Sequence, residues 1–151
     1  HFTPGKKGIK GRPFGGNAIF IRKSLSYKAW LILQEDFATV IKMDSKTLSL
    51  LVVGVYLQSS TSNSDYISSY QNQLDIISGT IKHFEESCET IIMGDFQCCP
   101  SFLTSPTSGN PNSLSPLIND FISDNGMCPI DIINGTGPNY TYQHATLPNS
   151  S

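Results

Sequence analysis

The stretch TLSLLVVGVYLQ, residues 47–58, is a nearly continuous apolar run. A strand of this composition is typical of the centre of a sheet, where both faces are covered. Two strand-length segments precede it, AWLILQE (29–35) and FATVIKMD (37–44), and GGNAIFIRK predicts a further strand over residues 16–22. Four strands in succession predict an antiparallel meander.

Beyond this stretch the hydrophobic pattern changes to steps of three and four, which predicts an amphipathic helix. Ser64 or Asn63 can cap its start, and Gly79 weakens it by about 1 kcal/mol relative to Ala if it lies in the interior. A second short helix is predicted over residues 113–125, ended by Gly126. The apolar face of the first helix is predicted to consist of Ile67, Tyr70, Leu74, Ile77, Ile81 and Phe84.

Three more segments are predicted to be strands. TIIMGDF, residues 90–96, lies between the two helices, and CPIDII (128–133) and NYTYQHA (139–145) follow the second helix. Strands and helices that alternate in this way, with both sheet faces to be covered, predict a layered α/β domain. A chain of 151 residues is long enough for one such domain, so residues 1–151 are expected to form a single one.

The strand over residues 90–96 ends on a polar pair. Because side chains alternate along an extended chain, Asp95 and Gln97 are expected to project on the same side. A carboxylate beside an amide can orient a water molecule and a phosphate oxygen, with the carboxylate taking a proton. Tyr56, at the end of the central strand, can donate to the same phosphate. An ordinary turn after Gly94, and a Tyr56 that only packs on a neighbour, explain the same residues, so both interpretations stay open.

Taken together, GRPFGGNAIFIRK, VVGVYLQ, the amphipathic helix, TIIMGDFQ and NYTYQHA resemble the endonuclease/exonuclease/phosphatase superfamily. The resemblance is closest to the apurinic-like endonuclease domains of non-LTR retrotransposons, and it extends over essentially the whole chain. It implies an α/β fold, a two-sheet α/β sandwich flanked by helices, which we expect to be incomplete at both ends of this chain. It also implies DNA as the partner and phosphodiester cleavage that depends on Mg²⁺ or Mn²⁺.

The resemblance implies a role for four residues. Asp95 is implied to activate the attacking water, and Gln97 stands where the family has Asn. Tyr56 is implied to contact the scissile phosphate, and Thr141 to help place the cluster. Gln97 is longer than Asn by one methylene, about 1.3 to 1.5 Å, and a misplacement of that order costs roughly 100-fold in rate. Ser59 stands where a further Asn is common in the family.

The family's metal-binding Glu lies upstream of the Gly-Gly strand, and its terminal Asp-His segment would begin near Ser151. We therefore expect this chain to be an interior piece that binds the metal weakly and does not cleave DNA alone. His144 is predicted to be a surface or packed histidine, because it is not part of an Asp-His pair. The cysteines are predicted to be small buried thiols in a reducing compartment, since adjacent Cys98 and Cys99 are poorly spaced for zinc.

Charge is unevenly distributed, although the net charge is only −2. Seven basic residues precede the first acidic one, and such a basic end either contacts phosphates or forms a solvated surface. The basic residues are Lys6, Lys7, Lys10, Arg12, Arg22, Lys23 and Lys28. No apolar run is long enough to span a membrane and no signal peptide is visible, so we expect no membrane partner and an intracellular location, nuclear if DNA is the substrate.

Three hypotheses follow from the sequence. The first is a DNA endonuclease of a retroelement, and the second is a phosphatase of the same superfold that acts on a lipid or inositol phosphate. The third is a catalytically inert remnant or interaction module, which Gln97 and Ser59 favour. Fold alone cannot separate the first two.

Overall fold

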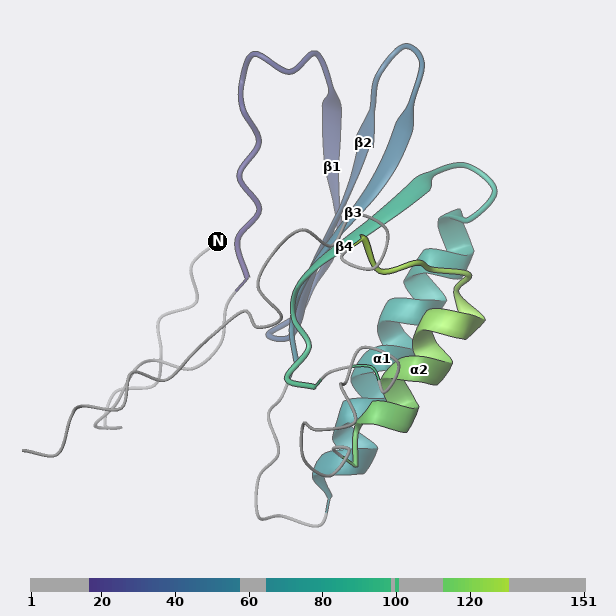
Figure 1. Cartoon of the computed structure of the whole chain (residues 1–151). Helices are drawn as coiled ribbons and strands as arrows, with labels where there is room; N and C mark the ends of the chain where they lie inside the picture. The colour runs from purple at the N-terminus through teal and green to yellow at the C-terminus, as the bar shows by residue number, and fades with distance from the viewer. Residues whose placement is uncertain (1–16, 58–64, 99, 101–112, 131–151) are drawn as a thin grey trace, which may run out of the picture.

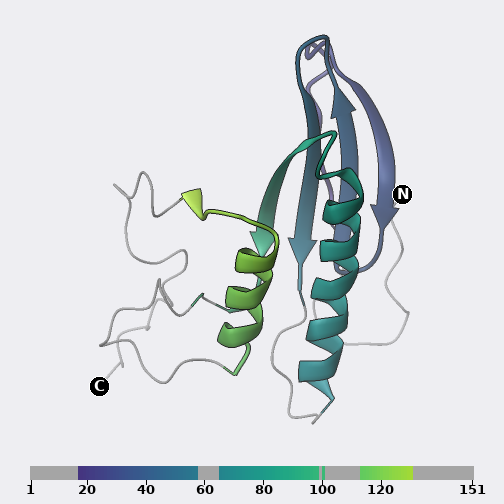
Figure 2. The same ribbon diagram turned by 90° about the vertical axis from the view of Figure 1, so that its right-hand side faces the viewer.

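The structure is a computed structural model, and it describes residues 17–57, 65–98, 100 and 113–130. These residues form an α/β unit in which two helices lie on one face of a four-stranded sheet (Figures 1 and 2). The strand order in the sheet is β1-β2-β3-β4. In chain order the elements are β1 (Lys28–Gln34), β2 (Ala38–Asp44), β3 (Ser49–Tyr56), α1 (Tyr66–Phe84), β4 (Glu89–Asp95) and α2 (Ser115–Asp124).

The predicted antiparallel meander is confirmed for the three strands β1, β2 and β3. The hydroxyl oxygen of Ser45 accepts hydrogen bonds from the backbone amides of Thr47 and Leu48, at 3.3 and 3.0 Å, and closes the turn between β2 and β3. Strand β4 then pairs with β3 in parallel, which requires the chain to cross over, and α1 makes that crossing. The carboxyl ends of β3 and β4 therefore meet at one end of the sheet.

Strand β3 is the covered centre that its composition predicts. Leu51, Val53 and Val55 belong to the core beneath the helices, while Val52 lies in a second cluster on the other face. Helix α1 contributes more core side chains than α2 does. Each fully buried side chain of the size of leucine or isoleucine stabilises the fold by about 1.5 to 3 kcal/mol. The helical core residues include Tyr70, Leu74, Ile77, Ile81, Leu114, Ile118 and Phe121.

The prediction of a strand over residues 16–22 is wrong for residues 17–22, the part that the structure describes. These residues pair with none of the described strands. This segment runs along the sheet face opposite the helices (Figure 1). Ile19 packs there beside Val52, and its Cγ1 atom lies 3.4 Å from the position that a Cβ on Gly54 would take. The alternation of apolar residues reflects packing of one side of the segment on the sheet, not a hydrogen-bonded ladder.

Smaller expectations also differ from the structure. Ile67 is 40% exposed and lies outside the buried face of α1. Asp65 precedes α1 and makes no side-chain cap, and the predicted caps Asn63 and Ser64 lie outside the described residues. Residues 128–130 form no strand, and Cys128 is exposed, not buried as predicted. Residues 131–133 and 139–145 lie outside the described residues.

The described residues form one open mixed sheet, so the coarser prediction, an α/β fold, is confirmed. The described helices cover one face of this sheet, and we refer to the other face as the open face. Neither described helix combines the length and the apolar character that crossing a bilayer requires.

Candidate active site at the ends of β3 and β4

Tyr56 and Asp95 are the last residues of two adjacent parallel strands, and they are direct partners in the register. Val55 and Ile92 face the helices, so alternation along each strand places Tyr56 and Asp95 on the open face. Both side chains are accessible, and Tyr56 is 43% exposed. The pairing continues past the strand end, because the Leu57 amide donates to the Asp95 carbonyl at 2.9 Å. The phenol and the carboxylate therefore share one rim of the sheet.

Gln97 is brought to Asp95 by a turn. Its backbone amide donates to Asp95 Oδ1 at 2.9 Å, and its side-chain Nε2 donates to Asp95 Oδ2 at 2.6 Å. The two side chains were expected to meet because a strand alternates, and that reason is wrong. Strand β4 ends at Asp95, and Gln97 has a φ of 56°, in the left-handed region. An aspartate that accepts the amide two residues later is the usual way to stabilise such a turn.

The turn interpretation and the chemical interpretation thus apply to the same residues. A carboxylate oxygen accepts more than one hydrogen bond, so Asp95 keeps acceptor capacity toward solvent after both bonds to Gln97 are made. The amide of Gln97 fixes the orientation of the carboxylate. The arrangement can hold a water molecule and accept its proton at a fixed place on the rim.

Gly94 is required where β4 approaches β3. Its φ is 141°, and a Cβ built on it would lie 2.0 Å from the carbonyl oxygen of Val55. Because Gly94 has no Cβ, the backbone of β3 can approach the backbone of β4 closely at this position. Asp95 follows directly and reaches the rim beside Tyr56.

Tyr70 also contributes to this turn, although the sequence predicts only that it lies on the apolar face of a helix. Its side chain is fully buried, yet its hydroxyl donates to the carbonyl of Phe96 at 2.7 Å and lies 3.1 Å from Cys98 Sγ. Burial raises the pKa of the Tyr70 hydroxyl, and the contact with Cys98 raises it further. The sequence contained one indication of this contact, the phenol hydroxyl on an apolar helix face, because a buried tyrosine hydroxyl needs a hydrogen-bond partner.

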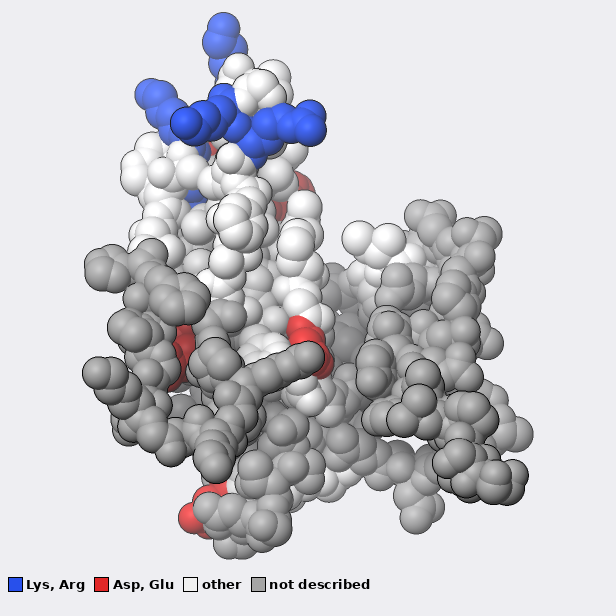
Figure 3. Space-filling model, turned by 90° about the vertical axis from the view of Figure 1, so that its left-hand side faces the viewer, with Lys and Arg blue, Asp and Glu red and all other residues white. Residues whose placement is uncertain are grey.

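The described basic residues gather at one end of the sheet, whereas acidic residues lie at both ends. The turn that carries Glu35 and Asp36 lies at the rim of Tyr56 and Asp95, because the Tyr56 amide donates to the Phe37 carbonyl at 2.9 Å. Basic side chains gather at the opposite end of the sheet (Figure 3), about 25 Å away for an eight-residue strand. They come from the segment before β1, from the first residue of β1 and from the turn after β2, and they include Arg22, Lys23, Lys28 and Lys46.

This separation bears on the predicted substrate. Arg22, Lys23 and Lys28 of the basic opening are too far from Asp95 to contact a phosphate bound there. Lys6, Lys7, Lys10 and Arg12 lie outside the described residues, as do Thr141, Ser59 and His144. A phosphate beside Asp95 would meet negative charge from the rim, so it would need a cation to offset that charge.

The described residues contain no group of three His, Cys, Asp or Glu side chains that could hold a metal ion. Mg²⁺ is commonly held by one or two carboxylates together with substrate phosphate and water. Asp95 can supply one such oxygen, and a complete site would need further ligands.

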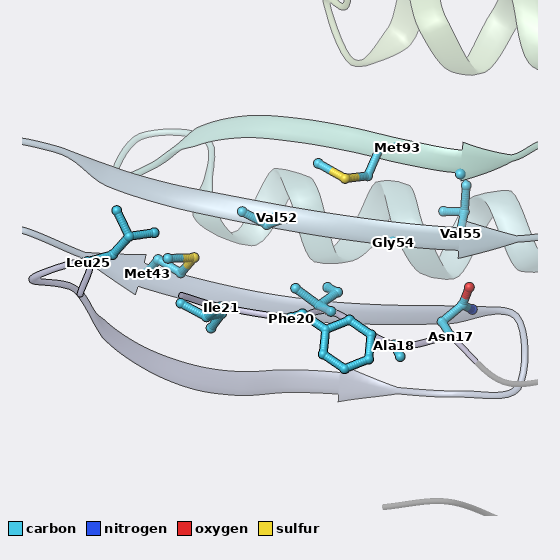
Figure 4. Close-up of a pocket in the computed structure, with 12 residues that line it drawn as sticks. Asn17, Ala18, Phe20, Ile21, Leu25, Met43, Val52, Gly54, Val55 and Met93 are labelled. Carbon is cyan, nitrogen blue, oxygen red and sulfur yellow. The ribbon is translucent and has the colours of Figure 1, made fainter. Parts of the chain in front are cut away.

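The open face also holds an apolar cavity of about 410 Å³. It lies between the segment before β1 and strands β2, β3 and β4 (Figure 4). Its lining is formed mainly by apolar side chains, among them Ile19, Ile21, Leu25, Met43, Val52 and Met93. Asn17 lies at the end of the cavity nearest Val55, and its Nδ2 is buried without a hydrogen-bond partner among the described residues. The cavity lacks the convergent charged groups that a phosphate requires.

Comparison of the chain with protein-family models and with curated protein sequences gives no match.

Proposed function

We propose that this chain forms part of a divalent-metal-dependent phosphodiesterase that cuts DNA, of the kind found in retroelements. The observation that supports the proposal most strongly is the register that pairs Tyr56 with Asp95 on the open face, with Gln97 bonded to the same carboxylate. We propose that the phenol donor, the proton acceptor and the amide surround one space of phosphate size. A nuclear location is part of the same proposal, because it follows from the DNA substrate.

In the proposed reaction the carboxylate of Asp95 accepts the proton of the attacking water. Gln97 keeps that carboxylate oriented through its 2.6 Å bond, and the hydroxyl of Tyr56 donates to an oxygen of the scissile phosphate. Thr141 is proposed to help place this cluster. A bound Mg²⁺ or Mn²⁺ would offset the charge on the phosphate, which the acidic rim makes necessary. Further metal ligands and the group that protonates the leaving oxygen are proposed to come from outside the described residues.

The two-sheet sandwich belongs to the same proposal. Apolar side chains remain accessible on the open face, and Leu31, Ile91 and Met93 are 58%, 39% and 53% exposed. A second sheet packed against this face would bury them and close the apolar cavity. It would also leave the rim of Tyr56 and Asp95 at the edge between the two sheets.

The inert module is the second candidate, and one observation favours it. Gln97 occupies both oxygens of Asp95, so a water or a metal ion must share them. The phosphatase hypothesis uses the same fold and the same rim. The described basic residues do not separate it from the nuclease, because they lie at the far end of the sheet.

The test is nicking of supercoiled plasmid DNA with Mg²⁺ or Mn²⁺, performed with the 151-residue chain and with the chain expressed together with its native flanking sequence. We expect nicking by the longer protein, a loss of roughly 100-fold or more in Asp95→Asn, and no measurable nicking by the 151-residue chain. Nicking that is unchanged in Asp95→Asn would overturn the proposal. No nicking by the longer protein would favour the inert module, and release of phosphate from inositol phosphates would favour the phosphatase.

A further inference from the structure

A single buried hydroxyl links the turn of the candidate site to the core. Tyr70 lies in the first half of α1, and its side chain is fully buried. Its hydroxyl donates to the Phe96 carbonyl at 2.7 Å, across a separation of 26 residues in the sequence. Leu74 and Ile77, the next residues on the same helix face, are also fully buried, so the helix that carries this hydroxyl is held by the core.

The bond acts on a peptide unit within the turn. The carbonyl of Phe96 and the amide of Gln97 belong to the same planar peptide group. The Tyr70 hydroxyl donates to the carbonyl at one edge of this group, and Asp95 Oδ1 accepts from the amide at the opposite edge, at 2.9 Å. Because the plane is rigid, fixing the carbonyl also fixes the direction of the amide and therefore the place of the carboxylate.

We propose that Tyr70 is a positioning residue for Asp95, acting through the peptide group between Phe96 and Gln97. Its consequence for catalysis rests on the proposed function, whereas its effect on the turn does not. The raised pKa of the buried hydroxyl is consistent with this role, since only the protonated phenol can donate. Cys98 Sγ, at 3.1 Å from the same oxygen, is a weak hydrogen-bonding group.

The chain offers a matched control on the same helix. Tyr66 lies one turn earlier, and its hydroxyl forms an exposed hydrogen bond with the Ser113 side chain. Tyr66→Phe and Tyr70→Phe each remove one phenol oxygen from α1. A contribution that is structural but not specific to the turn would change both variants in a similar way at Gln97.

The experiment is NMR spectroscopy of the isotope-labelled 151-residue chain. In Tyr70→Phe we expect the Gln97 backbone and side-chain amide signals to move toward their random-coil positions, with hydrogen exchange of the backbone amide about fivefold to tenfold faster, as loss of one hydrogen bond allows. In Tyr66→Phe we expect a change of less than about twofold. Gln97 signals that are unchanged in Tyr70→Phe, or that shift equally in both variants, would overturn the proposal.

A measurement on the wild-type chain covers the case in which Tyr70→Phe does not fold. In an equal mixture of H₂O and D₂O, the Cζ carbon of Tyr70 should give separate signals for the protonated and deuterated hydroxyl, because a buried bonded hydroxyl exchanges slowly. One averaged signal would overturn the proposal. None of these NMR measurements depends on catalysis. Absence of nicking would therefore contradict the proposed function and leave the role of Tyr70 in the turn unaffected.

Discussion

Replacing Gly94 by alanine tests the closest approach in the sheet. A Cβ at this position would lie 2.0 Å from the carbonyl oxygen of Val55 and 2.8 Å from its carbonyl carbon, and real Cβ atoms essentially never come within 3.0 Å of such atoms. The ends of β3 and β4 must therefore separate by about 1 Å or the backbone of β4 must rotate. The glycine φ of 141° is also one that alanine rarely adopts.

The cost can be estimated from the bonds at risk. The 2.9 Å bond from the Leu57 amide to the Asp95 carbonyl would lengthen beyond hydrogen-bonding distance, and one neighbouring ladder bond would weaken. Each such bond contributes about 1 kcal/mol. Strain at the positive φ adds about 1 to 3 kcal/mol. We expect Gly94→Ala to lower the free energy of unfolding by about 3 to 4 kcal/mol in total.

Urea denaturation followed by far-ultraviolet circular dichroism measures this difference. Gly79→Ala is the matched control, because Gly79 lies inside α1 with no atom within 4 Å of the added Cβ. The same chemical change should there raise the free energy of unfolding, by up to about 1 kcal/mol. A Gly94→Ala variant within about 1 kcal/mol of the wild type would refute the account of this contact.

Three further predictions concern the site and the dependence on pH. Gln97→Asn shortens the amide by one methylene toward the family's residue, and in the longer protein it should raise the rate of plasmid nicking, by up to about 100-fold; an unchanged or lower rate would contradict the role given to Gln97. The folded-state pKa of Tyr70 is raised above 10.0, so the free energy of unfolding should fall as the pH rises above 10. This group contributes at most about 1.4 kcal/mol per pH unit to the fall. Urea titrations should show that the contribution is absent in Tyr70→Phe. The hydrogen bond from Lys42, followed by that from Ser49, lowers the pKa of Asp44 below 3.8. The stabilising contribution of Asp44 is therefore present above pH 3.8 and is lost as the pH falls through the folded-state pKa. An acid titration of Asp44→Asn should lack this loss of stability, and added salt should reduce the loss in the wild type.

The elements that the sequence predicts well are those in which burial and periodicity agree. Val52 and Val53 face opposite sides of β3 and both are buried, so a continuous apolar run was a sufficient signal. The face of α1 follows from steps of three and four for the same reason. Residues 17–22 show where this reasoning fails, because a segment that packs on a sheet and a strand within it have the same alternation.

The candidate site was predicted only in part. The nearness of Asp95 and Gln97 was foreseen, but it depends on a left-handed residue that the strand pattern does not indicate. Tyr70 was not foreseen as part of the site, because the Phe96 carbonyl that accepts its bond is reached through the crossover from β3 to β4. Contacts of this kind depend on how distant elements pack, which local propensity does not contain.

The central claim is that Tyr56, Asp95 and Gln97 form one site for a metal ion and a phosphate. Its most direct test is paramagnetic broadening by Mn²⁺ in NMR spectra of the 151-residue chain, with a short DNA duplex present. We expect a small amount of Mn²⁺ to broaden the signals of Tyr56, Asp95 and Gln97 first, and we expect Asp95→Asn to remove this effect. Broadening centred instead on the glutamates from Glu85 to Glu89 at the other end of the sheet, with the signals of Asp95 unaffected, would contradict the claim.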